Sequence, residues 1–212
     1  MKLTEDFEDI VTLDGREIKV SLFFDDVLRA IELYQDKLIS DYEKWDILAE
    51  IFAADYEDYE HMSPFEKITF VQAVLKKFLS DKEGNEEGAE WQEKHYDILQ
   101  DAEFIYASFL FDYNMDLAEQ QGRLHWRKFI ALLNGLSEKT KFREVVSIRS
   151  QKITRDMSKE QAANLRRLQQ IYKLKETPKT EEEKAAQLEA MDNKGSAVAA
   201  MLTQKRRRGV DV

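Results

Sequence analysis

Residues that interrupt helices are rare in this chain, which has two prolines and seven glycines among its 212 residues. Proline lacks the amide hydrogen that a helix interior needs, and glycine costs about 1 kcal/mol there relative to alanine. A chain with few of either, and with many Glu, Lys, Leu and Ala residues, favours long helices. The sequence therefore predicts a mainly α fold.

One segment near the N-terminus favours strands instead: Ile10–Val20 reads IVTLDGREIKV. β-branched residues flank the pair Asp14-Gly15, which suits a two-residue turn that needs positive φ at both positions. A lone hairpin is marginally stable in water, so it should lie on helices or add its edge to another chain's sheet. The predicted fold class is mainly α, with an N-terminal β-hairpin packed on a helical body and an extended helical C-terminal tail.

Apolar periodicity and capping residues place the expected helices. The first should be capped by Asp25 or Asp26, and the third by the capping box that begins at Ser63, with Pro64 in its first turn. A later helix should be capped by Asp101 and end near Asn114, which tolerates the left-handed conformation. The predicted helices with both ends defined cover residues 25–37, 42–54, 101–114, 124–134 and 158–175. Two more should begin at residues 63 and 140, and one more is expected after Thr180. The third should bury a stripe made of Ile68, Val71, Leu75 and Phe78.

The clearest internal boundary is Ser80–Glu90, SDKEGNEEGAE, which lacks large apolar side chains and contains two glycines. It separates an N-terminal unit, residues 1–80, from a later helical module, with residues 81–90 as an acidic linker. Residues 91–155 form an aromatic-rich helical module. Residues 156–212 are expected to be a basic, helical and partly disordered tail.

Charge is divided unevenly along the chain. Residues 1–119 hold 31 acidic and 11 basic residues, a balance of −20, whereas residues 120–212 hold 11 acidic and 21 basic residues, a balance of +10. Such a chain can attract itself, a neighbour in an oligomer, or a partner with complementary patches. The alternative is that both regions are simply solvated.

Residues for catalysis or metal binding are sparse. The chain has no cysteine, which excludes disulfides and thiolate chemistry and fits a reducing compartment. Its three histidines stand far apart, and no HExxH, GxSxG or phosphate-loop motif occurs. We therefore predict no catalytic residue, no metal site and no cofactor. His125, next to Trp126, is better explained as a packing or capping residue.

Membrane and nucleic-acid functions also have little support. The N-terminal ten residues carry four carboxylates, and no segment approaches the roughly 18 apolar residues of a membrane helix, so we expect a cytosolic protein. The basic run Lys205–Arg208 could bind phosphates, with Arg166 and Arg167 nearby in sequence. The acidic remainder of the chain would repel DNA, which makes nucleic acid an unlikely partner.

Apolar surface is the remaining basis for function. The aromatic residues between Trp91 and Trp126 belong to a hydrophobic core, but rigid aromatic side chains also anchor protein interfaces. The helix after Ser158 has only a narrow apolar stripe, which is typical of a helix that binds a partner. The stripe consists of Leu165, Leu168, Ile171 and Tyr172.

Three segments resemble the phage gene-product-fifteen family, which occurs in siphophages and prophages of Gram-positive bacteria. They are DAEFIYASFLFDYNMDL (101–117), GRLHWRKFIALLNGL (122–136) and TKFREVVSIR (140–149). The resemblance covers about residues 7–155. This chain has Asn114 where the family pattern has glycine, and Arg127 where a second aromatic residue often stands. The residues that carry the resemblance are Ala107, Ser108, Phe109, Tyr113, Asp116, Leu117, Trp126, Phe129, Leu132, Leu133, Gly135 and Leu136.

The resemblance implies a tail assembly chaperone, which is not an enzyme. Such a protein covers the long apolar helix of the tape measure protein, recruits subunits of the major tail tube protein, and is absent from the mature virion. It also implies a homo-oligomer, assembled through the N-terminal unit in the host cell cytoplasm. Two alternatives stay open: a minor structural protein retained in the tail, and a DNA- or scaffold-binding factor that uses the basic tail. The expected partner-binding residues are Phe109, Tyr113, Trp126, Phe129, Leu133, Leu168 and Tyr172.

Overall fold

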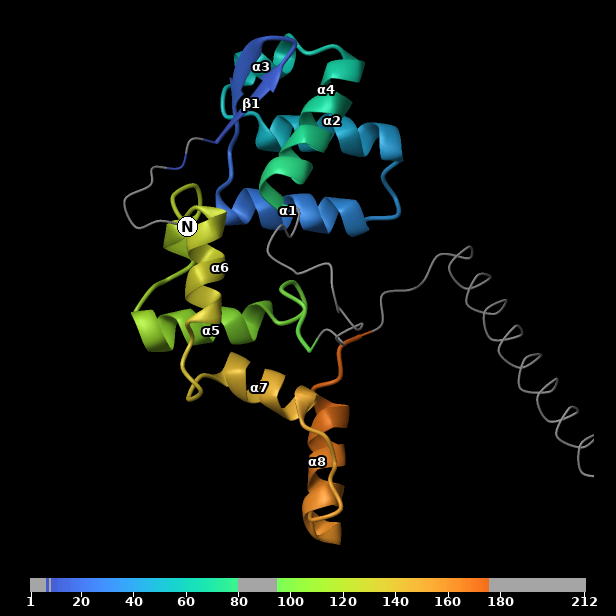
Figure 1. The fold of residues 1–212 in the computed structure, drawn as a ribbon, viewed down its shortest axis with the longest axis vertical. Coiled ribbons are helices and arrows are strands. Elements are labelled where there is room, and N and C mark those ends of the chain that lie inside the picture. The colour runs from blue at the N-terminus through green and yellow to red at the C-terminus, as the bar shows by residue number, and fades with distance from the viewer. Residues whose placement is uncertain (1–6, 8, 80–94, 176–212) are drawn as a thin grey trace, which may run out of the picture. The chain divides into compact units, whose positions relative to one another are not determined.

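The computed structural model describes residue 7, residues 9–79 and residues 95–175. Contacts within the chain define one compact unit that ends at Lys173 and a second, Leu174–Val212, of which two residues are described. The fold is mainly helical with an N-terminal hairpin, as predicted (Figure 1). No described helix is long and apolar enough to cross a membrane. The predicted linker at 81–90, Trp91, the helix after Thr180 and the basic run Lys205–Arg208 lie outside the described residues.

The hairpin consists of β1 (Ile10–Leu13) and β2 (Arg16–Lys19), paired antiparallel with Val11 opposite Ile18. Its turn residues have positive φ, 48° at Asp14 and 82° at Gly15, which confirms the turn predicted from this pair. Val11 and Ile18 are buried in the same core cluster as the first helices. The hairpin thus lies on helices and gains there the stability that an isolated hairpin lacks.

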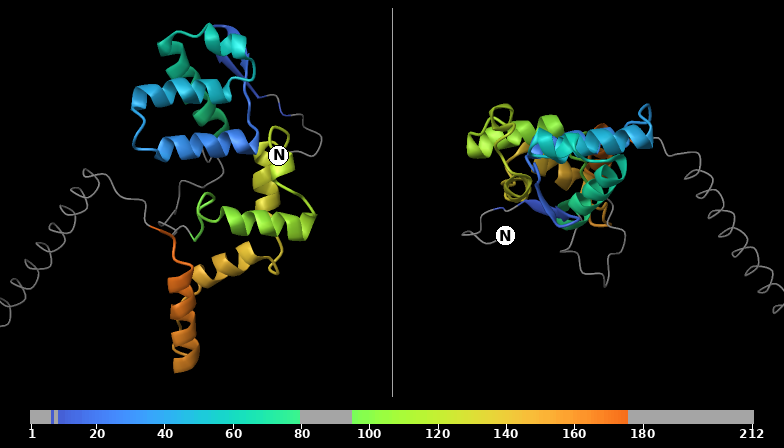
Figure 2. Two further views of the ribbon diagram at one scale, coloured as in Figure 1. Left: turned by 180° about the vertical axis from the view of Figure 1, so that it is seen from behind. Right: turned by 90° about the horizontal axis from the view of Figure 1, so that it is seen from above.

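The first core is formed by the hairpin and the helices that follow it (Figures 1 and 2). Phe52, Phe70, Val71 and Val74 are fully buried at its centre. A single turn of π-helix, Leu75–Leu79, continues the last of these helices. The helices are α1 (Phe24–Gln35), α2 (Asp41–Phe52), the short α3 (Tyr56–Glu60) and α4 (Pro64–Val74).

Two serines begin helices of this core with capping boxes. Ser63 does so at α4 as predicted, with Pro64 in the first turn, and Ser40 does the same at α2, which the sequence analysis missed. Hydrogen bonds from the serine side chain and backbone lower the pKa of Glu43 and of Glu66. Each box satisfies amides that the first helical turn leaves without partners.

The predicted cap of α1 is wrong. Phe23 occupies the cap position and no side chain caps the helix. Asp25 instead accepts a hydrogen bond from the amide of Gly122 (2.9 Å), and Asp26 accepts one from the hydroxyl of Ser21 (2.6 Å). These carboxylates connect α1 to other segments, so they are unavailable to its own first turn.

The stripe predicted for α4 is partly wrong. Val71 is buried, but Leu75 is 37% exposed. The π-helical turn that begins at Leu75 adds a residue to the turn and changes the direction of the side chains that follow. Before this turn, Phe70 and Val74 take the buried positions beside Val71.

A second core is built by the helices after residue 100. Phe109 and Phe129 are its largest fully buried side chains, with ring centroids 5.3 Å apart. Asn114 ends the first helix with φ 50°, as predicted. The elements are α5 (Ala102–Tyr113), a 3-10 turn (Ala118–Gln120), α6 (Trp126–Asn134), α7 (Lys141–Ser150) and α8 (Lys159–Ile171).

The two cores share residues at the start of α1. Phe24 belongs to the second core, where its ring stacks on that of Phe129 at 5.1 Å. The amide of Phe24 donates to the carbonyl of Leu124 (2.9 Å), and the amide of Trp126 donates to the carbonyl of Leu22 (2.7 Å). Trp126 packs against both cores. The predicted domain limits stay a prediction, but the two halves are joined by buried contacts.

His125 fastens this junction, in agreement with its predicted packing or capping role. Its Nδ1 accepts the amide hydrogen of Arg127 (3.0 Å) at the start of α6. Its Nε2 lies 2.7 Å from a carboxylate oxygen of Asp9, and its ring stacks on Phe7 at 4.1 Å. Both nitrogens and the ring face are therefore used inside the fold.

Ser108 joins α5 to α7 by a buried hydrogen bond. Its hydroxyl donates to the carbonyl of Phe104 (2.6 Å) and accepts the amide hydrogen of Phe142 (3.1 Å), in the first turn of α7. Ser108 is 1% exposed. This contact gives a physical reason for a serine in the alanine-serine-phenylalanine segment of α5.

Replacing Ser108 with alanine should lower the free energy of unfolding by about 1–3 kcal/mol, because a buried amide loses its acceptor. Chemical denaturation measures the loss, and hydrogen exchange of the Phe142 amide should accelerate. The matched control is Ser147→Ala on the exposed surface of α7, which should change stability by less than about 0.5 kcal/mol. Equal stability of the two variants would contradict this account.

The helix α8 begins at Ser158 with the predicted capping box and ends at Ile171 rather than at Lys175. Leu165 is buried and Leu168 is half-buried, whereas Ile171 is 60% exposed. The helix contacts α7. Part of the apolar stripe of α8, which we expected to bind a partner, is thus buried against the rest of the chain.

Candidate binding site

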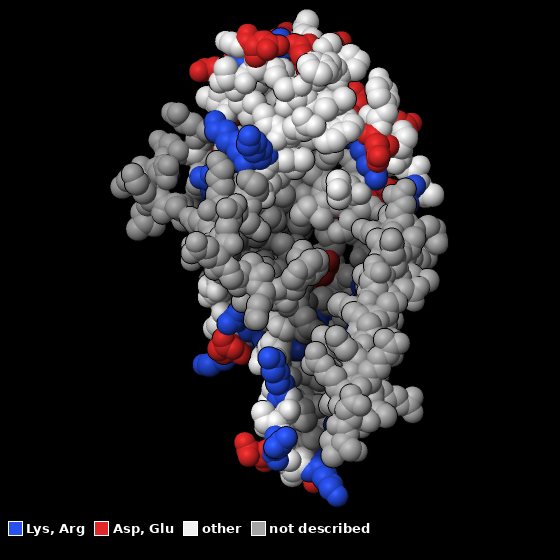
Figure 3. All heavy atoms as spheres, turned by 45° about the vertical axis from the view of Figure 1, so that its right-hand side comes forward, with Lys and Arg blue, Asp and Glu red and all other residues white. Residues whose placement is uncertain are grey.

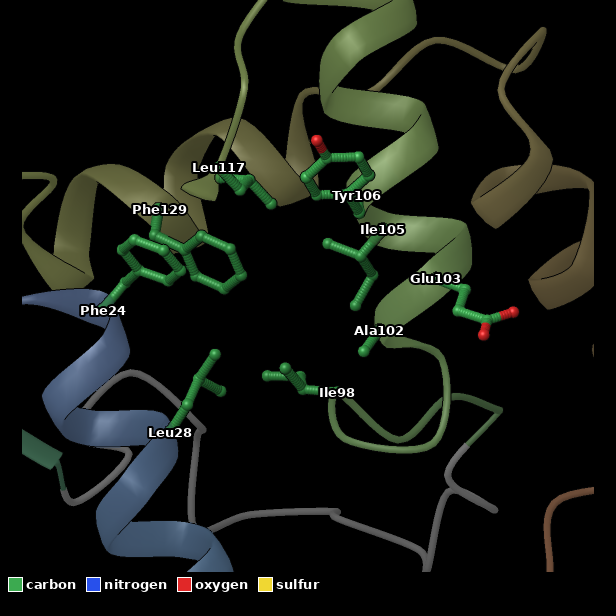
Figure 4. A pocket seen from close by; sticks show the side chains of 9 residues that line it. All are labelled: Phe24, Leu28, Ile98, Ala102, Glu103, Ile105, Tyr106, Leu117 and Phe129. Atoms are coloured by element: carbon green, nitrogen blue, oxygen red, sulfur yellow. The ribbon is translucent and has the colours of Figure 1, made fainter. Parts of the chain in front are cut away.

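A cavity of about 410 Å³ opens between the start of α1 and the start of α5 (Figure 4). Its volume falls in the range of roughly 300–1,000 Å³ that is typical of ligand pockets. Of the side chains around it, Glu103 is the only one with a charge. The lining residues are Phe24, Leu28, Ile98, Ala102, Glu103, Ile105, Tyr106, Leu117 and Phe129.

The lining residues divide into a buried floor and an accessible rim. The floor consists of residues that belong to the second core: Phe24, Ile105, Leu117 and Phe129. Leu28 and Ile98 are half-buried, and Ala102, Glu103 and Tyr106 are exposed. The floor is fixed by core packing, so the cavity is preformed.

The helix α5 carries more apolar surface than the fold covers. Its sequence, AEFIYASFLFDY, is apolar on all sides, a pattern that normally belongs to a fully buried helix. Yet Tyr106 is 39% exposed, Leu110 45% and Phe111 68%. Tyr106 and Leu110 are four residues apart, so they lie on one face that runs from the cavity along the helix.

Tyr106 is held in place at the edge of the cavity. Its hydroxyl donates to a carboxylate oxygen of Asp116 (3.0 Å), which also accepts the amide hydrogen of Ala118 (2.8 Å). The hydrogen bond to Asp116 and, to a smaller extent, the charge of Glu119 raise the pKa of Tyr106. The hydrogen bond to Asp116 thus positions the ring of Tyr106 as an apolar wall of the cavity.

Three of the predicted partner-binding residues lie in the core. Phe109, Phe129 and Leu133 are at most 2% exposed. Phe129 is also one of the residues that line the cavity, so a partner would reach it there. Phe109 and Leu133 do not line the cavity and are buried in the second core.

The other predicted binding residues are half-buried, and the structure does not bring them together. The Tyr113 hydroxyl donates to the carbonyl of Leu132 (2.9 Å), and Trp126 packs between the two cores. On α8, the Tyr172 ring packs edge-on against Phe104 at 6.0 Å, and Leu168 is half-buried. Their direct contact with a partner stays a prediction.

The residues that form the accessible surface were not predicted from the sequence. Leu28, Ile98 and Tyr106 line the cavity, and Leu110 and Phe111 are further exposed apolar residues of α5. The signal that could have identified the last two is the all-round apolar character of α5, which exceeds what one packed face requires. Leu28 gave no such signal, because α1 has an ordinary amphipathic pattern.

The arrangement is suited to binding an apolar molecule. Within the described ranges, no three His, Asp or Glu side chains lie close enough together to hold a metal ion. A preformed apolar cavity beside an exposed apolar helix face is the kind of surface with which helical proteins bind ligands or other macromolecules by apolar contact.

The comparison with family models identifies the family. The model of the Bacteriophage Gp15 protein family matches residues 3–174, and the chain belongs to this family. The chain is therefore a bacteriophage protein, and its family is not a known family of enzymes. Comparisons with curated proteins and with solved structures gave no match.

Proposed function

We propose that this protein is a tail assembly chaperone that binds the tape measure protein and recruits tail tube subunits. The supporting observation is the apolar cavity with the exposed Tyr106, Leu110 and Phe111 beside it. An extended amphipathic helix aggregates unless its apolar stripe is covered, and a groove with apolar walls covers such a stripe. Membership of a phage family is consistent with this role.

The proposal includes assembly and location. Many copies are needed to cover a long helix, so the chaperone acts as a homo-oligomer in the host cell cytoplasm. It leaves as the tube of major tail tube protein closes, and the mature virion lacks it. The uneven charge of the chain supports contacts between copies or with a complementary partner. Figure 3 shows basic side chains gathered at the lower end of the face it draws, over α8.

Co-expression with a tape measure fragment that is insoluble on its own tests the proposal. The wild-type chain should keep the fragment in solution and co-purify with it. The double variant Leu110→Ala/Phe111→Ala should lose this effect while retaining its fold, because both side chains are largely exposed. A fragment that precipitates equally with and without the wild-type chain contradicts the proposal.

Mass spectrometry of purified virions separates a chaperone from a minor structural protein of the tail. A chaperone should be missing from intact particles, whereas a structural protein should be present in a fixed ratio to tube subunits. Detection of this chain at a fixed ratio would replace the proposed role by the structural one.

A further inference from the structure

The rim of the cavity is acidic. Between His95 and Gly122 the chain has six Asp or Glu residues and no Lys or Arg. Three of the six carboxylates are engaged inside the fold. Asp101 pairs with Arg149 (2.7 Å), Asp112 accepts the amide hydrogen of Ser137 (2.6 Å), and Asp97 accepts that of Gln100 (2.9 Å).

Two of the other three carboxylates lie at the cavity edge. Glu103 lines the cavity with its carboxylate turned outward (Figure 4), and Asp116 accepts the hydrogen bond of the Tyr106 hydroxyl. No Lys or Arg in the described part of the chain forms an ion pair with any of them. On the facing helix α1, Arg29 already pairs with Asp25 (3.2 Å) and Asp26 (3.0 Å). Within the described residues, these carboxylates therefore have no cationic partner, and they lie beside an apolar floor.

The apolar surface of the site is longer than the cavity itself. Beyond the cavity it continues along α5 from Tyr106 to Leu110, which lies one turn further on, and Phe111 is exposed beside that face. A small compact ligand would not contact this extension. A helix would contact it, because it places apolar side chains at positions i, i+3 or i+4, and i+7 along one face. Charged residues beside those anchors set which partner is accepted, because like charges across an interface are unfavourable.

We propose that this site binds a basic amphipathic helix: one large apolar side chain enters the cavity between Leu28 and Tyr106, and Lys or Arg residues beside it lie against Glu103 and Asp116. The inference rests on the proposed function and names the chemistry of the tape measure segment that the site binds. By the same inference, acidic segments of the tape measure protein do not bind at this site, even where they carry an apolar stripe.

Two labelled synthetic helices test the charge requirement. Both carry the same stripe of Leu and Phe residues, and they differ only in having Lys or Glu beside the stripe. In fluorescence anisotropy titrations with the full chain at low salt, the Lys peptide should bind at least about tenfold more tightly. Added NaCl should reduce this ratio, as should the variant Glu103→Gln. Equal affinity for both peptides overturns the proposal, and so does failure of the Lys peptide to bind.

A cavity-filling variant tests the location. Ala102→Trp places a large ring at the exposed rim and should abolish binding of the Lys peptide. The matched control is Ala163→Trp on the exposed surface of α8, which should bind as the wild type does. Thermal melts establish that both variants fold. Unchanged binding of the Lys peptide by Ala102→Trp overturns the proposal. A second outcome also overturns it: the wild-type chain is a dimer and only Ala102→Trp dissociates that dimer, because the cavity would then hold a second copy of the chain.

The outcomes separate this inference from the proposed function. If Ala102→Trp still keeps the tape measure fragment in solution, the chaperone role stands and the cavity is not its binding site. If the Lys peptide binds in the cavity but the wild-type chain fails to protect the fragment, the site stands and the chaperone role falls.

Discussion

Replacing Arg149 with alanine is expected to lower the free energy of unfolding by about 3–5 kcal/mol, because it leaves a buried carboxylate without its partner. Arg149 donates two hydrogen bonds to the carboxylate of Asp101, at 2.7 and 2.8 Å, and Asp101 is 1% exposed. The same guanidinium donates to the backbone carbonyls of His95 (3.1 Å) and Tyr172 (2.5 Å). One side chain thus holds the start of α5, the end of α7 and the end of α8 together.

Denaturation with urea measures this loss. Arg149→Lys should recover only part of it, because an ammonium group cannot make the parallel pair of bonds to a carboxylate. Arg155→Ala removes an exposed arginine and should change stability by less than about 0.5 kcal/mol. If Arg149→Ala and Arg155→Ala lower the free energy of unfolding by the same amount, the buried pair of Arg149 and Asp101 does not stabilise the fold as described.

Replacing Phe129 with alanine should cost about 3–5 kcal/mol of stability by creating a cavity in the second core. The Phe129 ring is 1% exposed and is stacked with three other rings, those of Phe24 (5.1 Å), Phe109 (5.3 Å) and Trp126 (5.5 Å). Since Phe24 begins α1, the loss should also loosen the junction between the two cores. Thermal melts or urea titrations measure the effect.

Phe111→Ala is the matched control, because it removes the same side chain from a position that is 68% exposed. Its stability should stay within about 0.5 kcal/mol of the wild type. Its binding of the tape measure fragment should fall if the proposed site is correct. A large loss of stability in this variant, or none in Phe129→Ala, would reverse the assignment of core and surface on these helices.

Features set by neighbouring residues were predictable from the sequence. The turn at Asp14-Gly15, the capping box at Ser63 and the left-handed stop at Asn114 each depend on a few adjacent positions, and the structure confirms all three. The predicted mainly helical fold with its hairpin rests on the same local signals.

Features set by distant residues were not predictable. Asp101 is an acceptable helix cap in the sequence, but no side chain caps α5, because the carboxylate is held by Arg149, 48 residues away. Asp25 is likewise drawn to the amide of Gly122, 97 residues away. The cavity depends on Leu28 lying opposite Tyr106, which no local pattern specifies. The aromatic segment was expected to hold both core and interface, and only the fold separates Phe109 from Phe111.

The sharing of Phe24 between the two halves has a consequence for synthesis on the ribosome. Phe24 completes its packing only with Phe129, which is translated about 105 residues later, an interval of roughly 5 to 20 s. During that time the nascent first half carries an uncovered aromatic side chain at the start of α1. Rapid completion of the chain, or capture of the emerging segment by host folding factors, should therefore govern how much of the protein reaches the folded state.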